Sequence, residues 1–100
     1  MPKFETIYNN VNFALDKSNL SSKELAAAIR FSIASEYEAI QIYEQIIDKT
    51  DDVFVKKVLA DIVREEKVHV GELTRLLLEV DSDATDTLKE GFREASELKP

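Results

Sequence analysis

Two long stretches of the chain carry apolar residues at every third or fourth position, which is the spacing of one face of an α-helix. In the first stretch, residues 21–49, these positions are Ile29, Ile33, Ile40, Tyr43 and Ile47, and position 36 completes the spacing. In the second, residues 52–80, they are Val55, Leu59, Ile62, Leu73, Leu76 and Val80, and positions 66 and 69 complete a heptad pattern. No stretch shows the period of two that is typical of a half-buried strand, so the chain is predicted to be all-α.

Local signals mark where these two helices begin and end. Ser21 and Glu24 have the spacing of a capping box, in which each side chain bonds to the backbone of the other residue. Residues 49–52, Lys-Thr-Asp-Asp, break the first helix and offer a cap for the second. Because so short a connection joins them, the two helices are predicted to form an antiparallel hairpin. Shorter flanking helices are predicted over about residues 4–16 and 83–98.

Length and composition exclude several classes of protein. The 100 residues fit a single domain with a small core, so a second copy would be a natural source of additional buried surface. The absence of cysteine excludes disulfides, thiolate metal sites and thiol catalysis. A net charge of -7 argues against binding to nucleic acid or to an anionic membrane. No apolar run approaches about 18 residues and no signal peptide is visible, so a soluble cytoplasmic protein is expected.

Three titratable residues interrupt the apolar faces of the predicted hairpin. Glu36 occupies an apolar position of the first helix, and Glu66 and His69 occupy two such positions of the second. An unpaired carboxylate at a position of this kind is strongly destabilising or takes up a proton. A metal cation bound by carboxylate oxygens and an imidazole would remove that penalty.

The geometry of a hairpin predicts that these three residues meet. Glu36 and Glu66 are equally far from the middle of the connecting turn, at about 15 residues or about 22 Å along each helix axis. His69 lies three residues after Glu66 and therefore faces the same side of its helix. A single ion could thus contact all three side chains.

This set of ligands is half of a known pattern. Di-iron carboxylate bundles take one Glu from each of two helices and a Glu-x-x-His pair from each of two others. The chain has two long helices and one histidine, so it supplies one Glu and one Glu-x-x-His pair. We therefore predict that two copies meet face to face, which completes a four-helix bundle and a di-iron centre shared between the subunits.

The ligand types indicate the reaction. Carboxylate and imidazole ligands suit Fe(II), Mn(II) or Zn(II), and two carboxylate-bridged metals with open positions suit chemistry with O₂. The predicted activity is that of a ferroxidase, which oxidises Fe(II) to Fe(III) with O₂ or peroxide. Tyr43 lies two turns after Glu36, where it either fills the core or hydrogen-bonds a ligand and exchanges an electron with the centre. Glu38 is predicted to help iron approach.

Other interpretations of the same residues stay open. A lone histidine on a helix face is more often a hydrogen-bonded core or boundary residue than a metal ligand, and Glu-x-x-His is common by chance in acidic helical proteins. On that interpretation the chain is a non-catalytic helical dimerisation module. A further alternative is a peroxide-scavenging di-iron protein of the rubrerythrin type, although no cysteine module of the rubredoxin kind accompanies the chain.

The chain resembles the encapsulated ferritins in two segments, residues 36–45 and 65–69, which read EYEAIQIYEQ and EEKVH. These are two-helix ferritin-like proteins that work inside encapsulin nanocompartments. The resemblance covers about residues 22–80 and implies half of a ferritin-like bundle. It also implies that Glu36, Glu66 and His69 are the metal ligands.

The resemblance implies further features of the site and its partners. Tyr43 would lie beside the centre, and Glu38 would lie near the path of incoming iron. The family assembles as an annular decamer, a ring of dimers, and the surrounding encapsulin shell holds the iron mineral, so a cytoplasmic nanocompartment is the expected location. The chain differs from some members of the family at Ile42 and Ser35. Residues 96–100 show no apolar tail for docking to a shell, so a longer chain or a fusion to the shell protein is expected.

Overall fold

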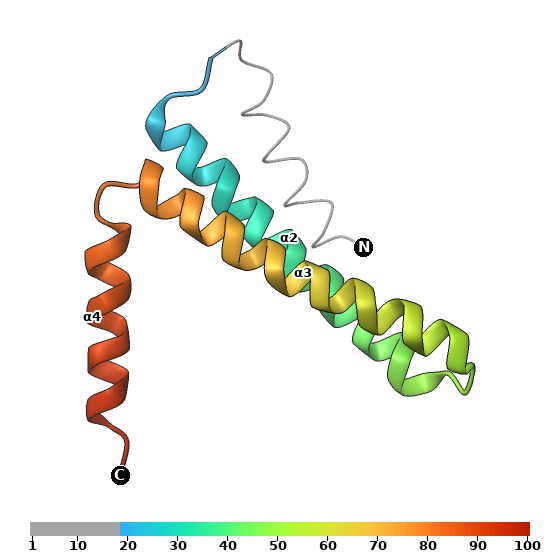
Figure 1. Cartoon of the computed structure of the whole chain (residues 1–100). Helices are drawn as coiled ribbons and strands as arrows, with labels where there is room; N and C mark the ends of the chain where they lie inside the picture. The colour runs from blue at the N-terminus through green and yellow to red at the C-terminus, as the bar shows by residue number, and fades with distance from the viewer. Residues whose placement is uncertain (1–18) are drawn as a thin grey trace.

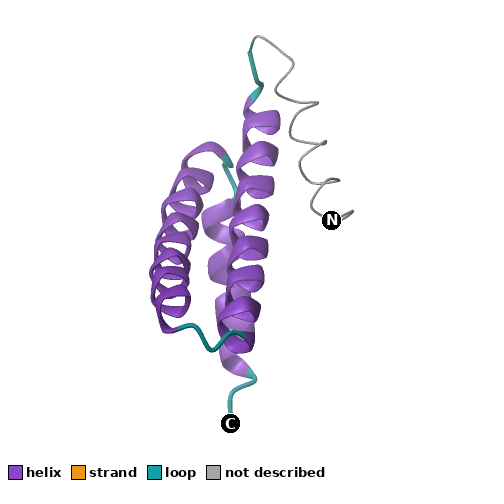
Figure 2. Cartoon of the chain, turned by 90° about the vertical axis from the view of Figure 1, so that its right-hand side faces the viewer, coloured by secondary structure: helices purple, strands orange, loops and turns teal. Residues whose placement is uncertain are grey.

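The computed structural model describes residues 19–100, which form three helices (Figure 1). Helix α2 spans Ser22–Lys49, α3 spans Val53–Val80 and α4 spans Ala84–Glu97. The described residues contain no strand (Figure 2), which confirms the all-helical prediction. None of these three helices carries a stretch apolar enough to span a lipid bilayer. The helix predicted over residues 4–16 lies outside the described part of the chain.

Side-chain caps fix the ends of the two long helices close to the predicted positions. The Glu24 backbone N–H donates to the Ser21 hydroxyl at 3.1 Å, and the Ser21 N–H donates to the Glu24 carboxylate at 3.0 Å, so the capping box is present. In the turn, the Val55 N–H donates to the Asp52 carboxylate at 3.1 Å and so caps α3. The Asp52 N–H in turn donates to the Thr50 hydroxyl at 3.1 Å. These bonds satisfy backbone groups that the helix ends leave free.

The core between α2 and α3 is thin. The two helices lie side by side as an antiparallel pair (Figures 1 and 2). The buried apolar residues of the described chain are few, and they are Ala26, Ile29, Ile40, Val63 and Ala84. No described side chain is completely removed from solvent. The hairpin therefore buries only part of each apolar face.

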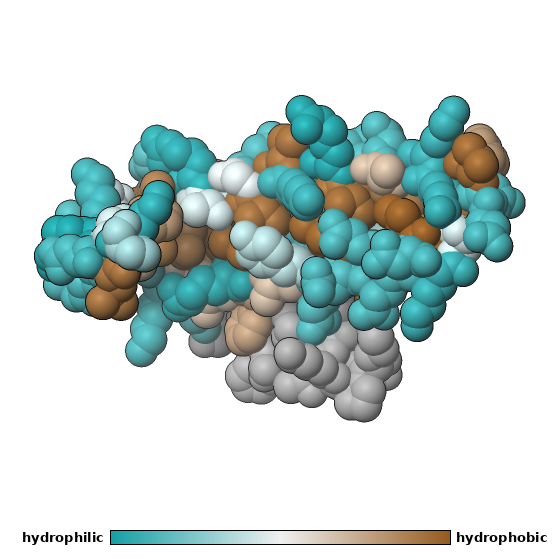
Figure 3. Space-filling model, turned by 90° about the horizontal axis from the view of Figure 1, so that it is seen from below, coloured by the Kyte–Doolittle hydropathy of each residue, from teal (hydrophilic) through white to brown (hydrophobic). Residues whose placement is uncertain are grey.

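The chain exposes more surface than a compact protein of its mass. Its accessible surface is 7756 Å², whereas a compact monomer of this mass exposes about 5,800 Å². Its radius of gyration is 16.7 Å, compared with about 13 Å for a compact domain of this length. Figure 3 shows apolar residues as a band along the hairpin on the face in view. This band is suited to pack against a further layer of helices.

Helix α4 stands apart from the hairpin (Figure 1) and lies where a short helix was predicted. Ala84 is buried at its start, whereas residues 85–100 are all exposed. The Arg93 guanidinium pairs with the Glu97 carboxylate at 2.6 Å, one turn further along the helix. The large exposed apolar side chains of α4 and the residue after it are Leu88, Phe92 and Leu98. The face that would normally stabilise such a helix by packing is therefore open to solvent.

A stabilising substitution is expected in α3. Gly71 lies inside the helix, and a Cβ added at this position meets no heavy atom within 4 Å. Glycine inside a helix is less favourable than alanine by about 0.5–1 kcal/mol. Gly71→Ala should therefore raise the free energy of unfolding by about this amount in urea denaturation. A decrease instead would mean that another chain approaches α3 closely at this point.

Candidate metal centre

The three titratable residues of the apolar faces come together within the hairpin. Helix α2 presents Glu36, and α3 presents Glu66 and His69 three residues apart on one face. The Glu36 and Glu66 side chains are 24% and 20% exposed, and the His69 side chain is 47% exposed. The packing that pairs the two helices therefore holds both carboxylates largely out of water, with the imidazole at the edge.

The distances between these side chains leave room for an ion. His69 Nδ1 lies 3.8 Å from Glu36 Oε2 and 3.8 Å from Glu66 Oε2. One ligand atom from each of the three residues lies within 4.8 Å of the other two. Separations of 3.8 Å are too long for hydrogen bonds, so the three groups converge without satisfying one another.

One oxygen atom of the cluster lacks a hydrogen-bond donor. Glu36 Oε2 is buried and has no hydrogen-bond partner among the described residues. A buried carboxylate oxygen without a donor is unfavourable, because the charge has lost its hydration and gained no replacement. A cation placed among the three side chains would supply that replacement. The donor set therefore fits a metal ion.

The chemistry of the donors narrows the choice of metal. Two carboxylates and one imidazole are typical ligands of Fe, Mn and Zn, whereas soft metals prefer thiolate ligands, and the chain contains no cysteine. Three donors from one chain do not fill the coordination positions of two metal ions. The three candidate ligands match one half of the donor pattern of a di-iron bundle.

Two further residues named from the sequence lie on the same helix. Tyr43 and Glu38 are both half-buried on α2. Within residues 19–100 no hydrogen bond or ion pair connects either side chain to the cluster of Glu36, Glu66 and His69. Their predicted roles beside the centre and on the path of iron stay predictions.

An ion pair beside the cluster was not predicted. The Lys67 ammonium lies 3.7 Å from a Glu44 carboxylate oxygen and joins α3 to α2. Lys67 directly follows the candidate ligand Glu66 in the sequence. Both partners are largely exposed, so the sequence shows them only as two of many surface charges, and only the register of the helices brings them together. An exposed pair of this kind contributes at most about 1 kcal/mol.

Comparison with known proteins identifies the family. The family model described as Rubrerythrin matches residues 8–100. The chain belongs to the rubrerythrin family. The structure of this rubrerythrin-family chain is similar to the crystal structure of the encapsulated ferritin domain from Pyrococcus furiosus, with a TM-score of 0.79 and 41% sequence identity. That similarity covers 83% of this chain and 85% of the other, and it confirms the resemblance to encapsulated ferritins.

Two curated relatives of this rubrerythrin-family chain are considerably longer than the chain itself. It is 44% identical over 78 residues to the ferritin-like-encapsulin shell fusion protein of Pyrococcus furiosus. The aligned residues make up 78% of this chain and 23% of that protein. It is 32% identical over 71 residues to the encapsulin nanocompartment cargo protein EncC of Myxococcus xanthus. Here the aligned residues make up 71% of this chain and 55% of that protein. The chain therefore spans about a quarter and about half of the lengths of these relatives.

Proposed function

We propose that the chain is a ferroxidase whose catalytic centre forms between two copies. Glu36, Glu66 and His69 of each copy bind iron, and Fe(II) is oxidised to Fe(III). The observation that carries the proposal is the Glu36 oxygen that is buried without a donor, within 4.8 Å of ligand atoms of the other two residues. Membership of the rubrerythrin family supports the same choice of metal.

The need for a second copy comes from the number of ligands and from the surface around them. Two metal ions in a di-iron bundle require two Glu-x-x-His pairs, and the chain contains one histidine. Val58 and Leu76 lie eleven residues before and seven after His69, on the same face of α3, and are 43% and 51% exposed. Packing this face against its equivalent on a second copy buries these side chains and brings the two ligand sets together.

Each side chain has a separate role in the proposed reaction. The carboxylates of Glu36 and Glu66 favour Fe(III) over Fe(II), because they neutralise the charge that the metal gains on oxidation. His69 binds through a neutral ring nitrogen. Each Fe(II) would give up one electron, so that two Fe(II) and two protons reduce one O₂ to H₂O₂ or one H₂O₂ to two water molecules. Tyr43 is proposed to orient a ligand or exchange an electron, and Glu38 to guide iron inward.

We extend the proposal to assembly and location. The exposed apolar face of α4, with Leu88 and Phe92, offers a second surface for contact between copies, which suits a ring of dimers such as the annular decamer. Both curated relatives carry encapsulin in their names. We therefore propose an encapsulin shell as the partner, with the iron mineral stored inside a nanocompartment in the cytoplasm.

Oxidation of Fe(II) by metal-free protein tests the activity directly. We expect ferric absorbance to develop in air several-fold faster than in protein-free buffer. Parallel reactions with equal oxidising equivalents of O₂ and H₂O₂ separate the ferroxidase from the second candidate, a peroxide-scavenging enzyme, which the family match also favours. Rapid oxidation by H₂O₂ alone would support the scavenger. If the rate equals that of protein-free buffer with O₂ and also with H₂O₂, both enzymatic functions are eliminated.

Metal binding is expected to stabilise the protein and to favour association. A ligand that binds only the folded, associated state stabilises it by about 2.7 kcal/mol when its free concentration is 100 times the Kd. Anaerobic Fe(II) should therefore raise the melting temperature and shift native mass spectra toward even-numbered oligomers. Magnesium, which prefers a full set of oxygen ligands, serves as the control ion. A monomer unaffected by iron would contradict the shared centre.

A further inference from the structure

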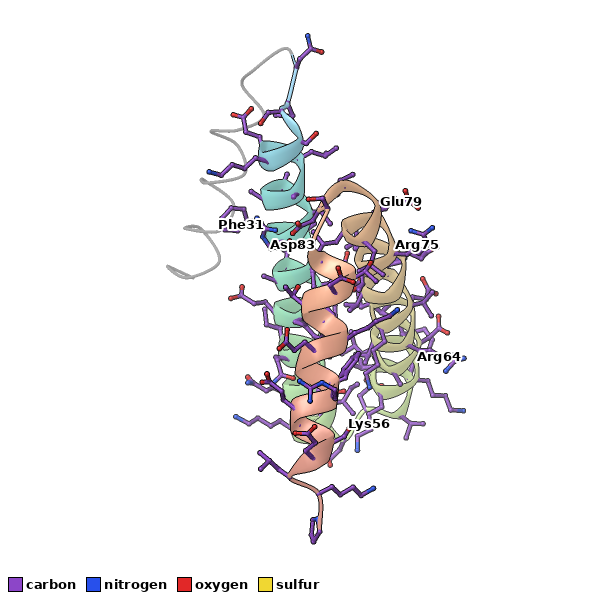
Figure 4. The ribbon with its side chains drawn as sticks, turned by 90° about the vertical axis from the view of Figure 1, so that its left-hand side faces the viewer. Phe31, Lys56, Arg64, Arg75, Glu79 and Asp83 are labelled. Carbon is purple, nitrogen blue, oxygen red and sulfur yellow. The ribbon has the colours of Figure 1, made fainter. Side chains whose placement is uncertain are left out.

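The direction of α4 depends on a very short connection. Residues 81–83 join α3 to α4, and after Ala84 every residue of α4 is exposed. Asp83 precedes the helix but makes no side-chain cap hydrogen bond. Figure 4 shows Asp83 at the point where α4 begins, beside α2. Little else in the described chain holds α4 in place, so the contacts at this corner decide where it points.

Asp81 is the centre of these contacts. Its backbone N–H donates to the Leu77 carbonyl at 2.9 Å and ends α3, while its carbonyl accepts from the Ala84 N–H at 3.2 Å and leads into α4. One carboxylate oxygen accepts from the Asp83 N–H at 3.4 Å. The other accepts from the Arg30 guanidinium at 3.0 Å. A single residue thus touches the end of one helix, the start of the next, and α2.

The contact with Arg30 spans the fold. Arg30 lies on α2, 51 positions before Asp81 in the sequence. The Asp81 side chain is 25% exposed and the Arg30 side chain 51% exposed, so the pair is only partly shielded from water. The two residues border a shallow depression between the start of α2 and the end of α3, together with Lys23 and Ala26. The ion pair therefore ties the corner to the first helix of the hairpin.

A second acid, Asp83, lies close to the ion pair of Arg30 and Asp81. The pKa of Asp83 is raised, first by its side-chain hydrogen bond with Asp81 and then by the negative charge of Asp81, whereas Arg30 acts in the opposite direction. Asp81 thus disfavours the ionised form of the Asp83 carboxyl, and the guanidinium of Arg30 counters this effect only in part. Within residues 19–100, Arg30 is the one cation that forms an ion pair with either carboxylate.

We propose that Arg30 and Asp81 form a charge-dependent clasp that fixes the direction in which α4 leaves the hairpin. Because Leu88 and Phe92 are exposed on α4, the clasp also fixes the direction in which the apolar face of this helix points. Exposed ion pairs have modest energies, so removing the charge of Arg30 should reduce the population of the observed direction by up to about fivefold. The clasp does not depend on metal and stands apart from the proposed ferroxidase activity.

Electron paramagnetic resonance between two spin labels tests the clasp. The chain lacks cysteine, so Asp61→Cys on α3 and Ser96→Cys on α4 provide two exposed attachment sites. Labelled protein is diluted with unlabelled protein, which leaves only distances within one chain. We expect a narrow distribution for the parent and a broad one for Arg30→Met. Arg75→Met is the matched control, because Arg75 pairs with Glu79 inside α3 at 2.6 Å, and it should leave the distribution narrow.

Two further measurements separate charge from folding. Exchanging the charges in the double variant Arg30→Asp, Asp81→Arg should restore the narrow distribution, which a merely structural role for either residue would not do. About 1 M salt, which screens charges beyond about 3 Å, should broaden the distribution of the parent without any substitution. If Arg30→Met loses helix content, the salt series on the parent protein becomes the test of whether the clasp depends on charge. A distribution that stays narrow in Arg30→Met or in salt would overturn the clasp.

Discussion

Glu36→Gln is expected to abolish iron oxidation while leaving the hairpin folded. The amide keeps the shape of the side chain but removes the negative charge that would hold iron. Loss of residues that only orient metal ligands lowers affinity or activity by about 10–100-fold, so loss of a ligand should reach at least about 100-fold. The same change removes the charge of a carboxylate whose buried oxygen has no donor, so the metal-free protein should become more stable by about 1 kcal/mol.

The opposite signs of these two effects make Glu36→Gln informative. The activity is measured as the initial rate of ferric absorbance, and the stability by urea denaturation of metal-free protein. Glu65→Gln is the matched control, because Glu65 is exposed on α3 next to the proposed ligand Glu66. It should change neither quantity substantially. Full activity in Glu36→Gln would exclude Glu36 as a ligand.

Leu76→Asp is expected to separate the two copies without unfolding either one. Leu76 is 51% exposed in the single chain, so a charge there is tolerated in the monomer. In the proposed dimer this position would be buried in the interface. An unpaired charge inside an interface costs about 3–5 kcal/mol, which weakens association by more than about 100-fold. Because the proposed centre needs both copies, the oxidation of iron should fall to the same extent at low protein concentration.

Sedimentation and circular dichroism distinguish the possible outcomes for Leu76→Asp. The variant should keep its helix content and sediment as a monomer. Val53→Asp is the control, because Val53 is 64% exposed on the opposite side of α3 from His69 and should leave association unchanged. If Leu76→Asp still associates and oxidises iron normally, the face around His69 is not the interface.

The helices and the meeting of the three ligands were predictable because they follow from local rules. The spacing of apolar residues gives the length of each helix, and the capping box at Ser21 gives the start of α2. A hairpin with a short turn has one register, so residues equidistant from the turn must lie level. Glu36 and Glu66 obey this rule, and the structure brings both of them to His69.

The contacts that were not predicted depend on side chains far apart in the sequence. Nothing near Arg30 indicates that it reaches Asp81, because both look like ordinary surface charges until α3 ends and the chain turns. The direction of α4 has the same origin, since three connecting residues allow many directions. How copies would associate is likewise a property of two surfaces, and the structure of one chain shows only that apolar residues stay exposed.

The shared centre can be observed directly by X-ray diffraction from iron-soaked crystals at the iron absorption edge. The proposal predicts two adjacent anomalous peaks between two copies, with Glu36, Glu66 and His69 of each copy as ligands. Iron bound by the residues of one chain alone would contradict it. So would iron bound away from these three side chains.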